Sequence, residues 1–145
     1  MPKKYYNVQI QNYLPHREPM LMVDEILEIS PEEVSTVFQI KEDNIFLQNG
    51  HFSESGITEH IAQTCSSILG QTFFVDENSE KKPLIGFISS IKKLKIYALP
   101  KVGTRLVSKA KKISEFGNIC TIFCQTYCED QLIAEAEISM FVKEI

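Results

Sequence analysis

Residues 55–73, SGITEHIAQTCSSILGQTF, predict one long amphipathic helix. Apolar side chains recur there every three or four residues, which is the spacing of one helix face. The members of this face are Ile57, Ile61, Cys65, Ile68, Leu69 and Phe73. Ser53 or Ser55 can cap the helix N-terminus. Gly70 lies on the opposite face, where glycine costs about 1 kcal/mol relative to alanine, so we expect a second backbone to pass close by.

The rest of the chain predicts strands separated by short turns. Residues 34–40 mostly alternate apolar and polar side chains, the period of a half-buried strand, and we expect them to form a hairpin with an apolar run at 20–29. Further strands are predicted at 84–98, 104–114, 119–128 and 132–142. Residues 7–14 are expected to form a short helix that ends before Pro15, and residues 76–82 an exposed loop.

One long helix beside a large sheet predicts an α+β architecture, in which a strongly curved antiparallel sheet wraps around the helix. Residues 1–145 are expected to form a single domain. One helix cannot cover both sheet faces, and open sheet edges invite another chain. We therefore expect a homodimer, or a higher oligomer built from it, in which two sheets join edge to edge with the helices near the two-fold axis.

Composition argues against several classes of function. The net charge of −4 is unlike the basic field of a nucleic-acid-binding protein. No apolar run approaches the ~20 residues of a membrane span, and the first residues lack the apolar stretch of a signal peptide. These features predict a cytoplasmic protein without a membrane partner. The cysteines are Cys65, Cys120, Cys124 and Cys128. They are expected to be reduced and to pack as small apolar residues. No cluster of side chains in the sequence has zinc-ligand spacing.

Candidate acid–base chemistry lies around the start of the predicted helix. His51 precedes it and Glu59 follows on its first turns. Histidine titrates near neutrality, and enzymes often pair it with a carboxylate. The alternatives stay open from these residues alone: His51 can be a loop contact, and Glu59 a solvated carboxylate favoured by the helix dipole. His60 is expected at the surface or an interface, and Gln63 to brace the helix against a strand.

Four motifs in register resemble the hotdog-fold 3-hydroxyacyl-(acyl carrier protein) dehydratases. Residues 14–24, LPHREPMLMVD, are similar to the N-terminal Pro-His-Arg…Val-Asp stretch of that family. Residues 50–52, Gly-His-Phe, match its catalytic motif, and residues 59–63, EHIAQ, are similar to its Glu-x-x-Ala-Gln. Residues 99–103, LPKVG, resemble its Pro-x-x-Gly turn. The segment between Phe52 and the helix is shorter than in the family, which makes the chain look like a divergent branch associated with aryl-polyene or flexirubin pigment pathways.

The resemblance implies a lyase of fatty acid or pigment biosynthesis that removes water from a 3-hydroxyacyl thioester on acyl carrier protein and gives the trans-2-enoyl thioester. It implies that His51 is the catalytic base, that Glu59 is the acid, and that the two meet across a dimer interface. It also implies a backbone oxyanion site at Gly56 or Ile57, with Gln63 in support. No metal or other cofactor is required for this chemistry.

Two alternatives keep the same fold but change the activity: an acyl thioesterase with Glu59 as base or nucleophile, and a non-catalytic acyl-binding subunit. The presence of His51 favours the dehydratase. Lysine clusters can attract an acidic carrier protein or protect exposed strands from edge pairing. Their members are Lys92, Lys93 and Lys95, and Lys109, Lys111 and Lys112. His16 and Arg17 are expected to hold the N-terminal turn, through Asp24 or a backbone carbonyl, rather than to take part in the chemistry.

Overall fold

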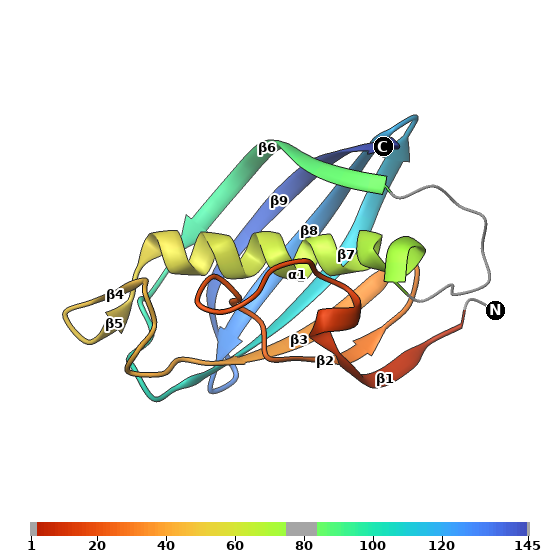
Figure 1. The fold of residues 1–145 in the computed structure, drawn as a ribbon. Helices are drawn as coiled ribbons and strands as arrows, with labels where there is room; N and C mark the ends of the chain where they lie inside the picture. The colour runs from red at the N-terminus through yellow and green to blue at the C-terminus, as the bar shows by residue number, and fades with distance from the viewer. Residues whose placement is uncertain (1–2, 75–83, 145) are drawn as a thin grey trace.

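The computed structural model describes residues 3–74 and 84–144, which form one long helix and a curved antiparallel sheet (Figure 1). In chain order the elements are β1 (Tyr5–Gln9), the 3-10 helix η1 (Ile10–Asn12), β2 (Glu25–Ile29), β3 (Glu33–Gln39), β4 (Leu47–Gln48), β5 (His51–Phe52), α1 (Glu54–Phe74), β6 (Leu84–Ile96), β7 (Arg105–Phe116), β8 (Ile119–Cys128) and β9 (Gln131–Glu144). Seven strands form the main sheet, in the order β1-β2-β3-β7-β8-β9-β6, and β4 pairs with β5 alone. The predicted α+β architecture is confirmed.

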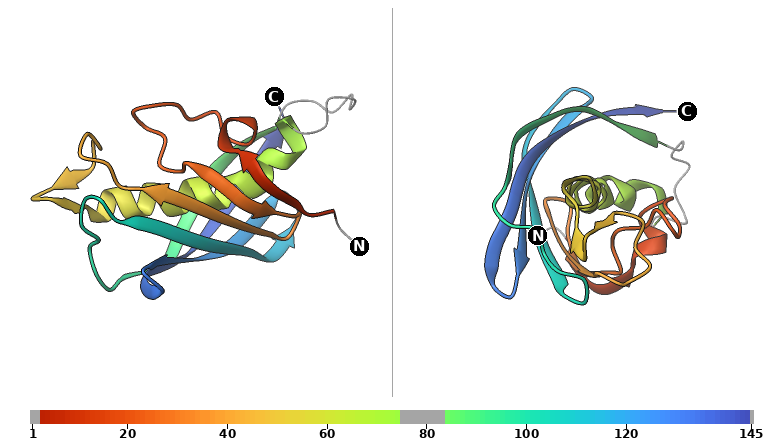
Figure 2. Two further views of the ribbon diagram at one scale, coloured as in Figure 1. Left: turned by 90° about the horizontal axis from the view of Figure 1, so that it is seen from below. Right: turned by 90° about the vertical axis from the view of Figure 1, so that its left-hand side faces the viewer.

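The sheet curves around α1, so its concave side faces the helix (Figure 2). On the long strands, alternate side chains point to opposite faces. Along β9, for example, Ala134, Ala136 and Ile138 are buried, whereas the residues between them are partly exposed. The curvature brings residues from sheet and helix into one apolar core.

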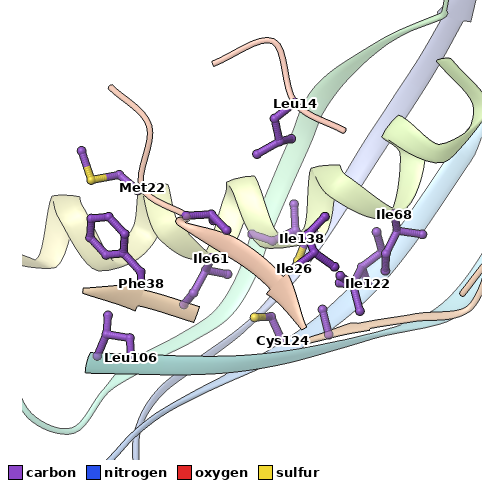
Figure 3. Packing of buried hydrophobic residues seen from close by; sticks show 14 of the residues in the cluster. Leu14, Met22, Ile26, Phe38, Ile61, Ile68, Leu106, Ile122, Cys124 and Ile138 are labelled. Carbon is purple, nitrogen blue, oxygen red and sulfur yellow. The ribbon is translucent and has the colours of Figure 1, made fainter. Parts of the chain in front are cut away.

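The core fills the space between α1 and the sheet (Figure 3). Ile61 and Ile68 on the helix pack with strand residues, and Leu14 and Met22 from the N-terminal segment belong to the same cluster. The strand residues labelled in Figure 3 are Ile26, Phe38, Leu106, Ile122, Cys124 and Ile138. None of the four cysteines forms a disulfide in the structure, and burial raises the pKa of the Cys65 thiol.

Most predicted strands are confirmed, with ends that shift by a few residues. The strand at 119–128 has the predicted bounds, and β2 and β3 form the predicted hairpin. The predicted strand at 20–29 begins only at Glu25. The first residues of the predicted strand instead cross the helix, because the backbone groups of Met20 and Met22 form hydrogen bonds with side chains of α1. The loop predicted at 76–82 lies outside the described residues.

The short helix predicted at 7–14 is wrong. Residues 5–9 form β1, which pairs antiparallel with β2, and a single 3-10 turn follows. Asn7 has a φ of 50°, outside the helical region. The apolar pattern that suggested a helix arises because Ile10, Tyr13 and Leu14 are buried at the turn rather than along one helix face.

Gly70 lies where the predicted second backbone crosses α1. A Cβ atom at Gly70 would collide with the backbone carbonyl oxygen of Tyr13, just after η1. The close approach is confirmed, but the crossing segment belongs to the same chain. Gly70 therefore explains how the N-terminal segment packs on the helix, and it gives no support to a partner subunit at this face.

Candidate functional site

Ser53 caps the start of α1. Its Oγ accepts a hydrogen bond from the N–H of Gly56 at 3.2 Å, and its carbonyl accepts one from the N–H of Ile57 at 3.0 Å. The two N–H groups predicted to form the oxyanion site, those of Gly56 and Ile57, therefore donate to Ser53 in this structure, and their role toward an oxyanion stays a prediction. The helix begins one residue earlier than predicted, so the N–H groups without an acceptor among the described residues are those of Glu54 and Ser55.

Gly56 has a packing role instead. A Cβ atom there would lie 2.5 Å from Cε1 of Phe52 and 2.8 Å from Cβ of Phe46. Phe52 is fully buried and its ring lies 5.7 Å from that of Phe38. The glycine thus allows the aromatic residue next to His51 to pack directly on the first turn of the helix.

His51 lies on a short hairpin beyond the N-terminal end of α1 (Figure 1). Asn49 and Gly50, with φ values of 51° and 77°, join β4 to β5 as a two-residue turn. The Gly50 carbonyl accepts a hydrogen bond from the N–H of Val102, and the N–H of Phe52 donates to the carbonyl of Pro100. The predicted turn at 99–103 is confirmed by these contacts, and it fastens the hairpin at the position of His51.

The ring of His51 is half-buried and has one polar partner among residues 3–74 and 84–144. Its Nδ1 lies 3.0 Å from the backbone carbonyl oxygen of Asn49. A carbonyl can only accept, so this contact places the proton on Nδ1 and leaves a lone pair on Nε2. That tautomer is the one that a general base requires.

Glu59 lies on the face of α1 that the N-terminal segment covers. Its Oε1 accepts a hydrogen bond from Nε2 of Gln63 at 2.9 Å, and Nε2 of His16 lies 3.9 Å away. The Glu59 side chain keeps 31% of its surface exposed. His16 and Arg17 were expected to hold the N-terminal turn through Asp24 or a backbone carbonyl. The backbone carbonyls are confirmed for Arg17, whereas Nε2 of His16 faces the carboxylate of Glu59. Asp24 instead accepts a hydrogen bond from the N–H of Gln39.

Gln63 joins Glu59 to the N-terminal segment. Its Oε1 accepts a hydrogen bond from the N–H of Met22 at 2.7 Å, and its Nε2 donates to the carbonyl of Met20 at 2.8 Å as well as to Glu59. The predicted support from Gln63 is present, but it acts on an irregular segment and not on a strand. Arg17 holds the preceding turn, as predicted, by donating to the carbonyls of residues 14 and 16.

His60 is completely buried, so its predicted place at the surface is wrong. Its Nδ1 lies 2.7 Å from the carbonyl oxygen of Met22, its Nε2 lies 2.7 Å from Oγ of Ser108, and its ring stacks on Phe38. Burial lowers its pKa to about 4, which keeps the ring neutral. His60 follows Ile57 by three positions, and this spacing places it on the same, buried face of the helix. The prediction gave more weight to the polarity of histidine than to this spacing.

The chain alone does not bring the two predicted catalytic residues together. Within residues 3–74 and 84–144, no hydrogen bond or ion pair joins His51 to Glu59. The same residues include no group of three or more histidine, cysteine or acidic side chains able to hold a metal ion. Among the described helices, none is long and apolar enough to cross a membrane.

Comparison with known proteins identifies the class. The model of the ApeP-like family, described as ApeP dehydratase, matches residues 8–144. The chain belongs to this family of dehydratases. The 3-hydroxyacyl-(acyl-carrier-protein) dehydratase FabZ of Syntrophobacter fumaroxidans is 32% identical over 136 residues, with 90% of this chain and 88% of the relative covered. FabZ of Wolinella succinogenes is 29% identical, with 96% and 97% covered.

Solved structures confirm the predicted hotdog fold. The dehydratase heterocomplex ApeI:P from Xenorhabdus doucetiae matches with a TM-score of 0.82 and 15% identity, over 94% of this chain and 92% of that one. A hypothetical thioesterase with coenzyme A from Streptococcus pneumoniae matches with a TM-score of 0.66 and 12% identity, over 83% and 85%. At these identities the likeness concerns the fold, which both structures share with this chain.

Proposed function

We propose that this chain dehydrates 3-hydroxyacyl thioesters carried on acyl carrier protein and releases trans-2-enoyl thioesters. The observation that carries the proposal is the dehydratase family match over residues 8–144, which includes both His51 and Glu59. The relatives named FabZ act, by their names, on 3-hydroxyacyl groups on acyl carrier protein. The free Nε2 of His51 suits the proton abstraction with which this reaction begins.

The reaction needs a base, a site for negative charge and an acid. Nε2 of His51 takes the proton from the carbon next to the thioester carbonyl, and the electron pair moves through the thioester oxygen to expel the hydroxyl group. Glu59 supplies a proton to the hydroxyl, which leaves as water. The N–H groups of Glu54 and Ser55 have no acceptor among the described residues and lie at the positive end of the helix dipole, where they stabilise the oxyanion. A proton returned from His51 to Glu59 restores the starting state.

We place this site at a homodimer interface, where His51 of one subunit reaches Glu59 of the other. The support is the edge strand β6, which has β9 on one side only and carries large exposed apolar side chains. These are Phe87, Ile88, Ile91 and Leu94, with 39–52% of their surface exposed. A long apolar edge strand is a strong site for pairing with another chain. A related subunit is the second candidate partner, because the similar ApeI:P structure is a heterocomplex.

Carrier protein and pathway follow from the same proposal. Lys109 and Lys111 lie exposed on β7, where they can meet an acidic carrier protein, and the Lys109 ammonium group lies 5.9 Å from the ring centre of Tyr127. The pathway is fatty acid or polyene pigment biosynthesis in the cytoplasm.

The experiment is an assay of the purified chain with 3-hydroxyacyl carrier protein, read by mass spectrometry as the loss of one water. We expect turnover, and a loss of roughly 10²–10⁴-fold in His51→Ala. Gln48→Ala is the matched control, because Gln48 lies opposite His51 on the same hairpin. Full activity in His51→Ala would reject the mechanism, and release of a free acid in place of the enoyl product would favour the thioesterase alternative.

A further inference from the structure

We propose that His16 is a positioning residue for Glu59, which fixes the carboxylate so that one particular oxygen, Oε2, performs the proton transfer. The inference rests on the proposed function and extends it to a residue outside the pair formed by His51 and Glu59. His16 would act through Glu59 and need not touch the substrate.

The contacts of Glu59 are divided unequally between its two oxygens. Oε1 accepts the hydrogen bond from Gln63 at 2.9 Å and lies 3.9 Å from Nε2 of His16. Oε2 has no hydrogen-bond or ion-pair partner among the described residues. Two side chains of the same subunit therefore hold one oxygen, and the other is left for the substrate.

The surroundings of His16 determine where its proton lies. Its Nδ1 is buried and has no hydrogen-bond partner among the described residues. A proton on Nδ1 would be a buried donor without an acceptor, whereas a proton on Nε2 points at Oε1 of Glu59, which is an acceptor whether or not Oε2 carries the proton that the mechanism transfers. The ring is thus set as an Nε2–H donor toward Oε1. The distance of 3.9 Å is too long for a direct hydrogen bond, so in this structure the ring acts on the carboxyl group as an oriented dipole at ion-pair range.

The backbone that carries His16 is held firmly in place. Arg17 donates from Nη1 to the carbonyls of Leu14 and His16, both at 2.8 Å. Farther along, Gln63 binds the backbone at Met20 and Met22. The segment is therefore tied to the same helix that carries Glu59, so His16 and Glu59 keep a fixed relation within one subunit.

Conservative variants test the donor. His16→Gln can place an amide nitrogen where Nε2 lies, whereas His16→Asn places it nearer to Nδ1. We expect His16→Ala and His16→Asn to lose kcat roughly 10–100-fold with KM within about twofold, because misplacement of a reacting group acts on the chemical step. His16→Gln should stay within severalfold of wild type. Unchanged kcat in His16→Ala, or equal losses in the Gln, Asn and Ala variants, would overturn the inference.

Mixed dimers test whether His16 serves the Glu59 of its own subunit. In a mixed dimer of His16→Ala and His51→Ala, one site loses both residues and the other keeps both, so random reassortment should restore about a quarter of the wild-type sites. A mixture of His16→Ala and Glu59→Ala should stay at the sum of its parents, because each site then lacks one residue. General damage to the His16→Ala subunit would instead prevent recovery in the mixture with His51→Ala as well.

The outcomes separate this inference from the proposed function. Recovery for His51→Ala with Glu59→Ala, but none for His16→Ala with His51→Ala, would overturn the role of His16 alone. No recovery in any mixture, with mixed dimers shown by native mass spectrometry, would reject the site across the interface. The kinetics of the Gln, Asn and Ala variants would then decide on His16 within a single chain.

Discussion

The two halves of the proposed site are built in different ways. Glu59 lies on a central helix and has its polar contacts from its own chain, with Gln63 and His16 on one oxygen. His51 lies on a hairpin with β strands of only two residues each, and its ring has one partner, the carbonyl of Asn49. The half with Glu59 is held by contacts within its own subunit. The half with His51 presents Nε2, which has no partner among the described residues, at one end of the molecule.

This difference indicates which half depends on a partner. The carboxylate is fixed before any second chain arrives, because the N-terminal segment is tied across the helix. The histidine has a proton on Nδ1, and Nε2 has no partner among the described residues. If the proposed site is completed by association, activity should depend on the oligomer more steeply than folding does.

The largest effect is expected from breaking the edge of the sheet. Ile91 lies on β6 with 39% of its surface exposed, and Ile91→Lys would place a charge at the proposed interface. We expect a monomer by sedimentation, with activity reduced by at least about 100-fold because no complete site remains. Phe116→Lys is the control: Phe116 is 86% exposed at the end of β7, and its substitution should leave the dimer intact. A fully active Ile91→Lys monomer would contradict the division of the site.

A second prediction concerns the packing of the N-terminal segment on α1, which holds the Glu59 half of the site. Gly70→Ala would drive a methyl group into the carbonyl of Tyr13, and backbone atoms on both sides cannot easily move. We expect a loss of about 3 kcal/mol in the free energy of unfolding, measured by urea denaturation. Ser55→Ala, an exposed position on the same helix, should change it by less than about 0.5 kcal/mol. A stable Gly70→Ala protein would show that the N-terminal segment is not locked onto α1.

The smallest effect concerns His60, which ties the same segment to the sheet. Its pKa is lowered to about 4 in the folded protein, against about 6.5 in the unfolded chain. As the pH falls, the histidine is therefore protonated in the unfolded state before it is protonated in the folded state. The stability that neutral His60 contributes is complete above about pH 6.5 and is lost toward pH 4. Lowering the pH from 7 to 5 therefore reduces the free energy of unfolding by about 2 kcal/mol through His60.

Comparison with His60→Gln isolates that contribution. The variant should be less stable at pH 7, because it loses the contacts of a buried ring, but it should lack this part of the decline with acid. Chemical denaturation at several pH values measures the difference. A decline of equal size in both proteins would assign the acid sensitivity to other groups.

Sequence periodicity predicted the central architecture well because it reports burial. The apolar face of residues 55–73 and the strand at 119–128 correspond closely to α1 and β8. Gly70 predicted the crossing backbone because glycine in a helix has a physical cost. The motif at residues 50–52 indicated His51 as a candidate catalytic residue. The Asn49-Gly50 pair before it forms the turn of the hairpin that carries this histidine.

The failures have a common cause, which is contact between distant residues. His60 reads as polar, yet Met22 and Ser108 satisfy both of its nitrogens inside the core. Residues 20–24 read as a strand, yet their backbone is bound by helix side chains. The approach of His16 to Glu59 spans 43 positions of sequence, and no local pattern could reveal it.

The central claim is that one active site contains His51 from one subunit and Glu59 from the other. The most direct measurement is the activity of His51→Ala and Glu59→Ala proteins, refolded together in equal amounts and compared with each homodimer alone. Each homodimer lacks one residue in every site, whereas a mixed dimer has one complete site and one site without both residues. We predict recovery of about a quarter of wild-type activity after random reassortment, with melting curves showing that both variants fold. Activity no greater than the sum of the homodimers, in a sample shown to contain mixed dimers, would contradict the account.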